Sequence, residues 1–186
     1  MESSLAPMLR GEPPRPGIYL ATGPSLLPAW FLRALGPALG RGDGLFWIDG
    51  ASPFDAYGSS YAARARGLDP RAMLEQVKLA RAFNLWQLET MICRKLPRQW
   101  KGQPVVVSDP LPLFYDEDVP FPEARAVAHR VLAGMKALPA VWMLLSVDRP
   151  APRGRETLLA EVAREAVAVA GLRQSGSRWL LDLAKG

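Results

Sequence analysis

The sequence contains one cysteine and one histidine among its 186 residues. The lone cysteine, Cys93, excludes an internal disulfide and a zinc site built from several cysteines. With His129 as the single histidine, neither a Ser-His-Asp nor a Cys-His arrangement can be assembled. No apolar run reaches the roughly 18 residues of a membrane span, and the first residues lack a basic-then-apolar signal sequence. We therefore expect a cytoplasmic protein that binds no membrane, with no metal site and no cofactor.

The composition indicates one globular domain of ordinary size. Hydrophobic residues make up 49% and charged residues 22% of the chain, which is the usual balance for a soluble domain. The proline-rich residues 1–16 are predicted to form a flexible lead-in, and residues 17–186 a single α/β domain. The net charge of +5 permits nucleic-acid binding without requiring it.

Strand and helix patterns alternate along the chain. Apolar runs predict strands at 18–22, 45–49, 77–82, 105–107 and 141–147. Helical spacing predicts helices at about 27–39, 55–66, 70–76, 84–96, 123–137 and 156–170. Residues 171–184, with Gly176 between two extended runs, predict a C-terminal hairpin. The alternation predicts an α/β fold with a mostly parallel sheet and helices on both faces, which would bind ligands at the carboxyl ends of its strands.

The turn after the first strand lacks the residues of a phosphate-binding loop. The strand ends at Gly23, and a helix follows from about residue 27. A phosphate loop needs a second glycine, a lysine and a Ser or Thr to hold phosphates and Mg²⁺. Those places hold Pro28, which has no N–H donor, Ala29, which has no charge, and Trp30, which has no hydroxyl. The turn therefore predicts the scaffold of a nucleotide site without its chemistry.

Residues 45–95 resemble the RecA/RadA-type strand-exchange recombinases, especially the archaeal and eukaryotic branch. The similarity rests on Leu-Phe-Trp-Ile-Asp-Gly at 45–50, Ala-Arg-Gly-Leu-Asp-Pro at 65–70 and Leu-Ala-Arg-Ala-Phe-Asn at 79–84, in the family's order and spacing. Residues 104–109 are similar to the Walker B strand, which ends here at Asp109. The resemblance covers roughly residues 17–170 and implies a three-layer RecA-like core.

The departures from the family imply a pseudo-ATPase rather than an enzyme. Ala51 stands where the family has its catalytic Glu, and Ser146-Val147-Asp148 replaces the usual polar sensor. Without the loop lysine and oriented donors, little remains to stabilise phosphoryl transfer. The resemblance implies that Asp109 corresponds to the family's magnesium ligand. Here we expect that this aspartate no longer binds magnesium and instead caps a loop or pairs with an arginine. Asp49, Asp109 and Asp148 each end a predicted strand and could together hold a hard cation. Polar residues are common at strand ends, so no metal is assigned.

Two loops are candidate interaction surfaces. Arg149, Arg153 and Arg155 lie where recombinases have a DNA-contacting loop, and we predict that they bind DNA phosphates. The alternative is a solvated basic loop that caps the next helix. The loop at 110–122 places aromatic residues beside three consecutive acids at 116–118, which would repel phosphates. It is either a protein-contact surface or a packed proline-rich loop.

These features favour a non-catalytic RecA/RadA paralogue that assists DNA repair or recombination. It would bind DNA, a partner protein such as a recombinase, polymerase or other repair protein, or both. One alternative is a protein-binding module like the SulA-type cell-division inhibitors and related mutagenesis accessory proteins, without DNA binding. Another is a nucleotide-binding ATPase with an atypical phosphate loop. The sequence leaves the oligomeric state open.

Overall fold

The computed structural model describes residues 16–39, 44–51, 54–65, 67–148, 150–176 and 178–185. Strands and helices alternate along most of this length. In chain order the elements are β1 (Gly17–Gly23), α2 (Leu27–Leu39), β2 (Leu45–Asp49), α3 (Ala56–Arg64), α4 (Pro70–Glu75), β3 (Val77–Arg81), α5 (Leu85–Thr90), the π-helix η1 (Met91–Lys95), α6 (Leu96–Gln99), β4 (Val105–Ser108), the 3-10 helix η2 (Leu111–Phe114), α7 (Phe121–Lys136), β5 (Ala140–Ser146), α8 (Thr157–Glu165), β6 (Ala168–Ser175) and β7 (Arg178–Lys185).

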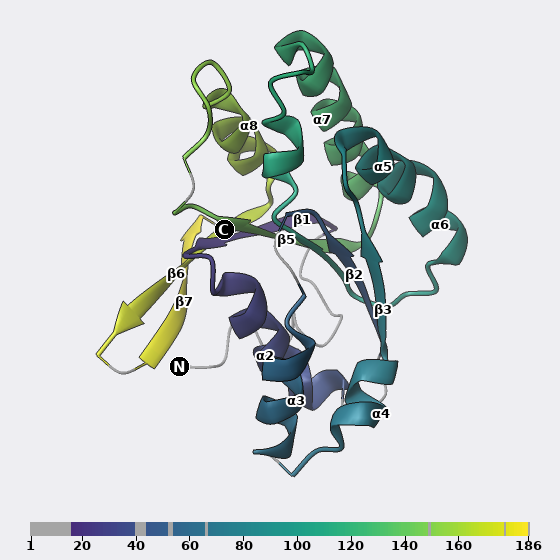
Figure 1. Cartoon of the computed structure of the whole chain (residues 1–186), viewed down its shortest axis with the longest axis vertical. Coiled ribbons are helices and arrows are strands. Elements are labelled where there is room, and N and C mark those ends of the chain that lie inside the picture. The colour runs from purple at the N-terminus through teal and green to yellow at the C-terminus, as the bar shows by residue number, and fades with distance from the viewer. Residues whose placement is uncertain are drawn as a thin grey trace.

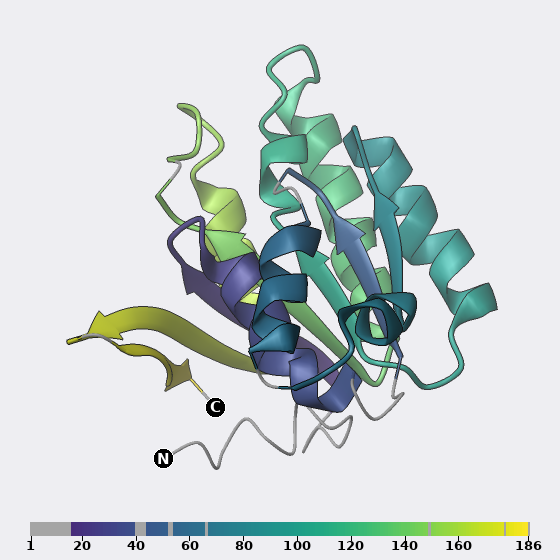
Figure 2. The same ribbon diagram turned by 60° about the horizontal axis from the view of Figure 1, so that its bottom comes forward.

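The strands form one seven-stranded sheet in the order β3-β2-β4-β5-β1-β6-β7. Neighbours from β3 to β6 pair in parallel, and β7 returns antiparallel to β6. Figure 1 shows α2, α3 and α4 on one face of the sheet and α5, α7 and α8 on the other. The predicted α/β fold, with a mostly parallel sheet, helices on both faces and a C-terminal hairpin, is thus confirmed. In Figure 2 this hairpin projects from the body of the domain.

The order of the strands determines where loops leave the sheet. From β1 the chain crosses to β2 over the face that carries α2, and from β3 it returns through β4 and β5 over the opposite face. The loops after β1 and β5, which are neighbouring strands, therefore diverge to opposite faces. A parallel sheet has its ligand-binding crevice at such a point, outside the carboxyl ends of the strands.

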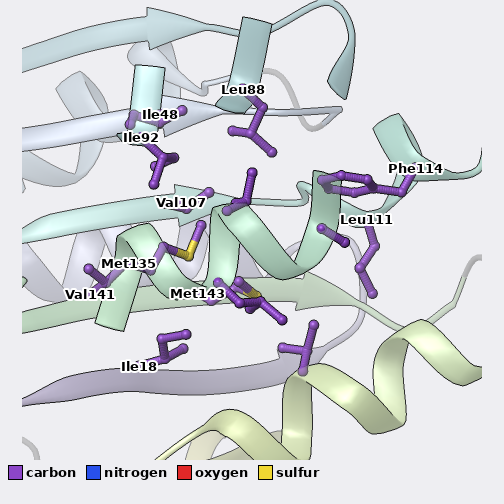
Figure 3. Packing of buried hydrophobic residues seen from close by; sticks show 14 of the residues in the cluster. Ile18, Ile48, Leu88, Ile92, Val107, Leu111, Phe114, Met135, Val141 and Met143 are labelled. Atoms are coloured by element: carbon purple, nitrogen blue, oxygen red, sulfur yellow. The ribbon is translucent and has the colours of Figure 1, made fainter. Parts of the chain in front are cut away.

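Two apolar cores lie on the two faces of the sheet. On one face, Met143 and Val107 from strands meet Leu88, Ile92 and Met135 from helices (Figure 3). On the other face, the aromatic rings of Trp142 and Phe31 have their centroids 5.0 Å apart. In β4, Val105 and Val107 belong to the first core and Val106 to the second, because successive side chains of a strand point to opposite faces.

Local signals fixed most element ends. The predicted helix at 27–39 coincides with α2. The backbone N–H of Gln87 donates to the side-chain oxygen of Asn84 at 2.9 Å, and the Gln87 side chain accepts from the backbone of Phe83. This arrangement resembles a capping box, and it marks the start of the helix predicted at 84–96. No described helix is long and apolar enough to cross a membrane.

The predicted helix at 156–170 is too long. Helix α8 ends at Glu165, and β6 begins at Ala168 rather than at residue 171. The backbone N–H of Val167 donates to the carbonyl of Ile18 at 2.9 Å, which draws the chain to the side of β1. Val167 and Val169 are β-branched and favour a strand once this neighbour is present.

Candidate functional site

The residues at the degenerate phosphate loop serve packing. Gly23 ends β1 close to β6: a Cβ at this position would lie 2.9 Å from the Cβ of Leu172. Pro28 is buried in the first turn of α2, and Trp30 packs against the core on that face. The carbonyl of Ala29 accepts a hydrogen bond from the side chain of Arg33 at 3.1 Å. These side chains therefore support the domain at the place where a nucleotide site would hold phosphates.

A carboxylate occupies the turn ahead of α2. The backbone N–H of Ser25 donates to Oδ2 of Asp148 at 2.9 Å, across 123 residues of sequence. The N–H of Val147 donates to the carbonyl of Gly23 at 2.8 Å, so the loops after β1 and β5 are bonded twice. Free backbone N–H groups at the start of a helix attract anions. A phosphate bound here would have to displace Asp148.

Asp49 at the end of β2 is buried, and both oxygens of its carboxylate accept hydrogen bonds. One carboxylate oxygen accepts from Nε and Nη2 of Arg81, at 2.9 and 2.6 Å. The other accepts from the hydroxyl of Ser108 at 3.2 Å. That hydroxyl in turn accepts from the indole N–H of Trp47 at 3.0 Å. The network joins β2 to both of its neighbours, and the carboxylate is a structural ion-pair partner.

Asp109, the counterpart of the Walker B aspartate, also makes structural bonds. It has a φ of 44°, in the left-handed region that aspartate tolerates better than most residues. Its carboxylate accepts from the backbone N–H and the hydroxyl of Ser146, at 2.6 and 2.7 Å. Its carbonyl accepts from Ala51 at 3.1 Å. Asp109 thus connects the ends of β4 and β5 and the loop after β2.

The three strand-end aspartates do not converge on a common point. Asp49 bonds to Arg81, Asp109 to Ser146, and Asp148 to Ser25. Within the residues that the structure describes, no three His, Cys, Asp or Glu side chains are grouped to hold a metal ion. The cation site considered from the sequence therefore has no geometric support among these residues.

The three arginines of the predicted DNA loop do not share one environment. Arg149 lies outside the described residues, and Arg153 is exposed on a turn. Arg155, by contrast, is only 6% exposed. Its guanidinium donates to the carbonyls of Phe114 and Val119, at 2.6 and 2.5 Å. We correct the prediction for Arg155: the side chain is enclosed and bonded to two backbone carbonyls of the protein, which does not fit a contact with DNA phosphate.

A cavity of about 250 Å³ lies at the carboxyl ends of β4 and β5, between η2 and α8. Its lining is mostly apolar, with polar groups from Asp109, Tyr115, Ser146 and Glu156. Burial raises the pKa of the Tyr115 phenol. Backbone hydrogen bonds from Glu156 itself and Gly154 lower the pKa of the Glu156 carboxyl, which stays charged. The sequence indicates Asp109 and the loop at 110–122 as candidates but not the cavity, because the walls of the cavity come from segments distant in sequence.

The edge strand β3 is a second feature that sequence analysis missed. Among the described residues β3 pairs only with β2. The hydrogen bonds from Leu45 N to Gln76 O and from Ala82 N to Asp49 O show that even-numbered positions face β2. Because backbone groups alternate along a parallel ladder, odd positions such as Leu79 direct their N–H and C=O to the open side. A further strand could pair there.

Exposed apolar side chains occur on β3 and in the residues that follow it. Leu79 is 49% exposed, and Phe83 and Trp86 just beyond β3 are 74% and 44% exposed. Charged residues such as Lys78 on β3 are the usual protection of an edge strand against unwanted pairing. The polar Lys78 and Arg81 within an otherwise apolar run were the sequence signal that β3 lies at an edge. An edge with both charges and exposed aromatics is suited to selective pairing.

No protein-family model and no curated protein matches this chain.

Proposed function

We propose that this chain is a non-catalytic, RecA/RadA-like protein that assists DNA repair or recombination by binding a partner protein. The observation that carries the non-catalytic part of the proposal is the hydrogen bond from Ser25 N–H to Asp148, which lies in the turn where a nucleotide phosphate would bind. The part on partner binding rests on the open edge of β3. The α/β fold with helices on both faces, which the resemblance implies, supports it. The bonds of Asp49 to Arg81 and of Asp109 to Ser146 support it further, because both carboxylates have partners within the protein.

Nucleotide is expected to leave the stability of the protein unchanged. Adding Mg-ATP at millimolar concentration should not raise the melting temperature, because Asp148 and Pro28 deny phosphate the donors of the turn. A ligand present at 100 times its Kd would add about 2.7 kcal/mol to the free energy of unfolding. For a domain of this size that is a shift of roughly 5–10 °C. Differential scanning fluorimetry measures it directly.

The Asp148→Asn variant is the matched control for this experiment. It removes the negative charge while keeping a side chain that can accept from Ser25. If the wild type itself shows a shift that requires Mg-ATP, the pseudo-ATPase proposal is wrong, and the atypical-loop ATPase becomes the better hypothesis. A shift confined to the variant would show that the carboxylate excludes the nucleotide, as proposed.

Partner binding is proposed at the open edge of β3. An extended segment of the partner would pair with the outward N–H and C=O of Leu79, as in strand addition to other sheets. The exposed side chains of Phe83 and Trp86 would contact apolar residues of that segment. Buried aromatic anchors are where protein interfaces concentrate their binding energy. This mode requires neither nucleotide nor DNA.

Replacing Leu79 by proline is expected to weaken partner binding about tenfold or more, since it deletes an outward N–H and blocks the added strand. Leu79→Ala keeps the N–H and loses only side-chain contacts, so its effect should be clearly smaller. Proline is tolerated at edge positions whose N–H faces solvent, so circular dichroism should show a folded variant. Affinity is measured against purified candidates: a RecA-type recombinase, a repair polymerase and a cell-division polymer protein.

The panel also separates the functional classes. Binding only to the division protein would favour the SulA-like alternative. Equal affinities of the proline and alanine variants would contradict strand addition. DNA binding that weakens with salt and with Arg153→Ala would favour the DNA-binding form of the accessory hypothesis, for which Arg153 is the exposed described residue.

A further inference from the structure

The cavity beside Asp109 has walls that are fixed in place. One wall is formed by Leu111, Pro112 and Tyr115, and the other by Val147, Pro150, Ala151, Glu156 and Leu159. Arg155 holds them together, because its two carbonyl acceptors, Phe114 and Val119, belong to the opposite loop. The guanidinium also lies 5.6 Å from the centre of the Phe121 ring. A ligand would therefore meet a pre-formed pocket and would not have to order two loops on binding.

The lining selects an apolar group. The apolar lining residues are Leu111, Pro112, Leu145, Val147, Pro150, Ala151 and Leu159. None of the described residues that line the cavity is basic, and Asp109 and Glu156 are acidic. Phosphate and carboxylate ligands would be repelled, and an apolar side chain would lose water-exposed surface on entry.

Acidic residues also lie outside the cavity, next in sequence to residues of its walls. Glu156 is exposed at the rim, and Tyr115 in the wall is followed by the exposed acids Asp116, Glu117 and Asp118. The exposed cation Arg153 lies on the same loop as Glu156, so the acidic side of the mouth is the one that carries Asp116, Glu117 and Asp118. At about 250 Å³ the cavity is also smaller than the roughly 300–1,000 Å³ of typical small-molecule sites.

We propose that this cavity receives one large apolar side chain from a basic peptide segment of a partner protein, whose lysines or arginines pair with Glu156 and the acids at 116–118. Only a ligand longer than the cavity reaches both the apolar pocket and these carboxylates. The site lies at the carboxyl ends of β4 and β5, away from the β3 edge, and it does not depend on partner binding there.

A short fluorescent peptide with a central tryptophan between lysines tests this inference by fluorescence anisotropy. The wild type is expected to bind it at least about tenfold more tightly than the same peptide with alanine at the centre. A version with glutamates in place of the lysines should bind still more weakly, because the rim carboxylates repel it. Raising the salt concentration should lower the affinity for the lysine peptide, but the ratio of affinities between the tryptophan and alanine peptides should stay the same.

Two pairs of variants locate the binding. Ala151→Trp fills the cavity from its wall and should weaken the peptide about tenfold, whereas Ala160→Trp on the exposed side of α8 should change nothing. Glu156→Lys should weaken it several-fold, whereas Glu123→Lys on α7 should not. Equal effects within either pair would overturn the proposal. So would tryptamine binding as tightly as the peptide, which would identify a small-molecule pocket instead.

Discussion

Replacing Gly50 by alanine is expected to lower the free energy of unfolding by about 3 kcal/mol or more, and to leave little folded protein. A Cβ at Gly50 would lie 2.3 Å from the carbonyl oxygen of Asp109 and 2.9 Å from the Cα of Pro110. Both are backbone atoms, so no side chain can rotate away to make room. The N–H of Gly50 also donates to the carbonyl of Ser108 at 2.8 Å, which fixes the approach of the two loops.

Gly171 in β6 is the matched control. A Cβ there meets nothing within 4 Å, so Gly171→Ala is expected to change stability by no more than about 0.5 kcal/mol. Urea denaturation of both variants, followed by circular dichroism, gives the comparison. Similar stabilities for Gly50→Ala and Gly171→Ala would contradict this prediction. They would show that the loops after β2 and β4 can move apart at the carboxyl ends of the strands.

The elements with short-range signals could be predicted from the sequence. Asp69 caps α4 by accepting from Arg71 N–H at 2.9 Å, and Asn84 caps α5, each through a contact between residues two or three positions apart. The helix α2 was predicted from the spacing of its apolar residues, which is also a local property. The parallel sheet followed because strands and helices alternate, and such a chain has few ways to bury both.

The candidate site depends on contacts that no local pattern encodes. Asp148 meets Ser25 across 123 residues, and Arg155 meets Phe114 across 41. An arginine among Pro and Gly residues has the same sequence signature whether it faces solvent or fills a gap between two loops. For this reason Arg155 was assigned to DNA, and the cavity that it stabilises was not foreseen. For the edge position of β3 the local signal was limited to the charged Lys78 and Arg81, and the position itself follows from the strand order, which is set by the whole sheet.

Replacing Arg155 by alanine is expected to lower the free energy of unfolding by about 2–4 kcal/mol. The change removes two hydrogen bonds and leaves the carbonyls of Phe114 and Val119 without these donors in a buried place. Arg155→Lys should recover only part of the loss, because one ammonium group cannot match the forked geometry of a guanidinium. Arg153→Ala, two residues away and exposed, should stay within about 0.5 kcal/mol of the wild type.

The same variants test the function of the loop. If Arg155 holds the cavity walls, Arg155→Ala should lose both stability and affinity for the tryptophan peptide, and Arg155→Lys should be intermediate in both. Any decrease in DNA binding by Arg155→Ala or Arg155→Lys should be no larger than the decrease in the fraction of folded protein. If Arg155→Ala instead keeps the stability of the wild type but loses salt-dependent DNA binding, the guanidinium is exposed in solution. Removing a buried arginine would leave its carbonyl partners unpaired and lower the stability, so an unchanged stability means that Arg155 is not buried. The DNA contact predicted from the sequence would then be supported.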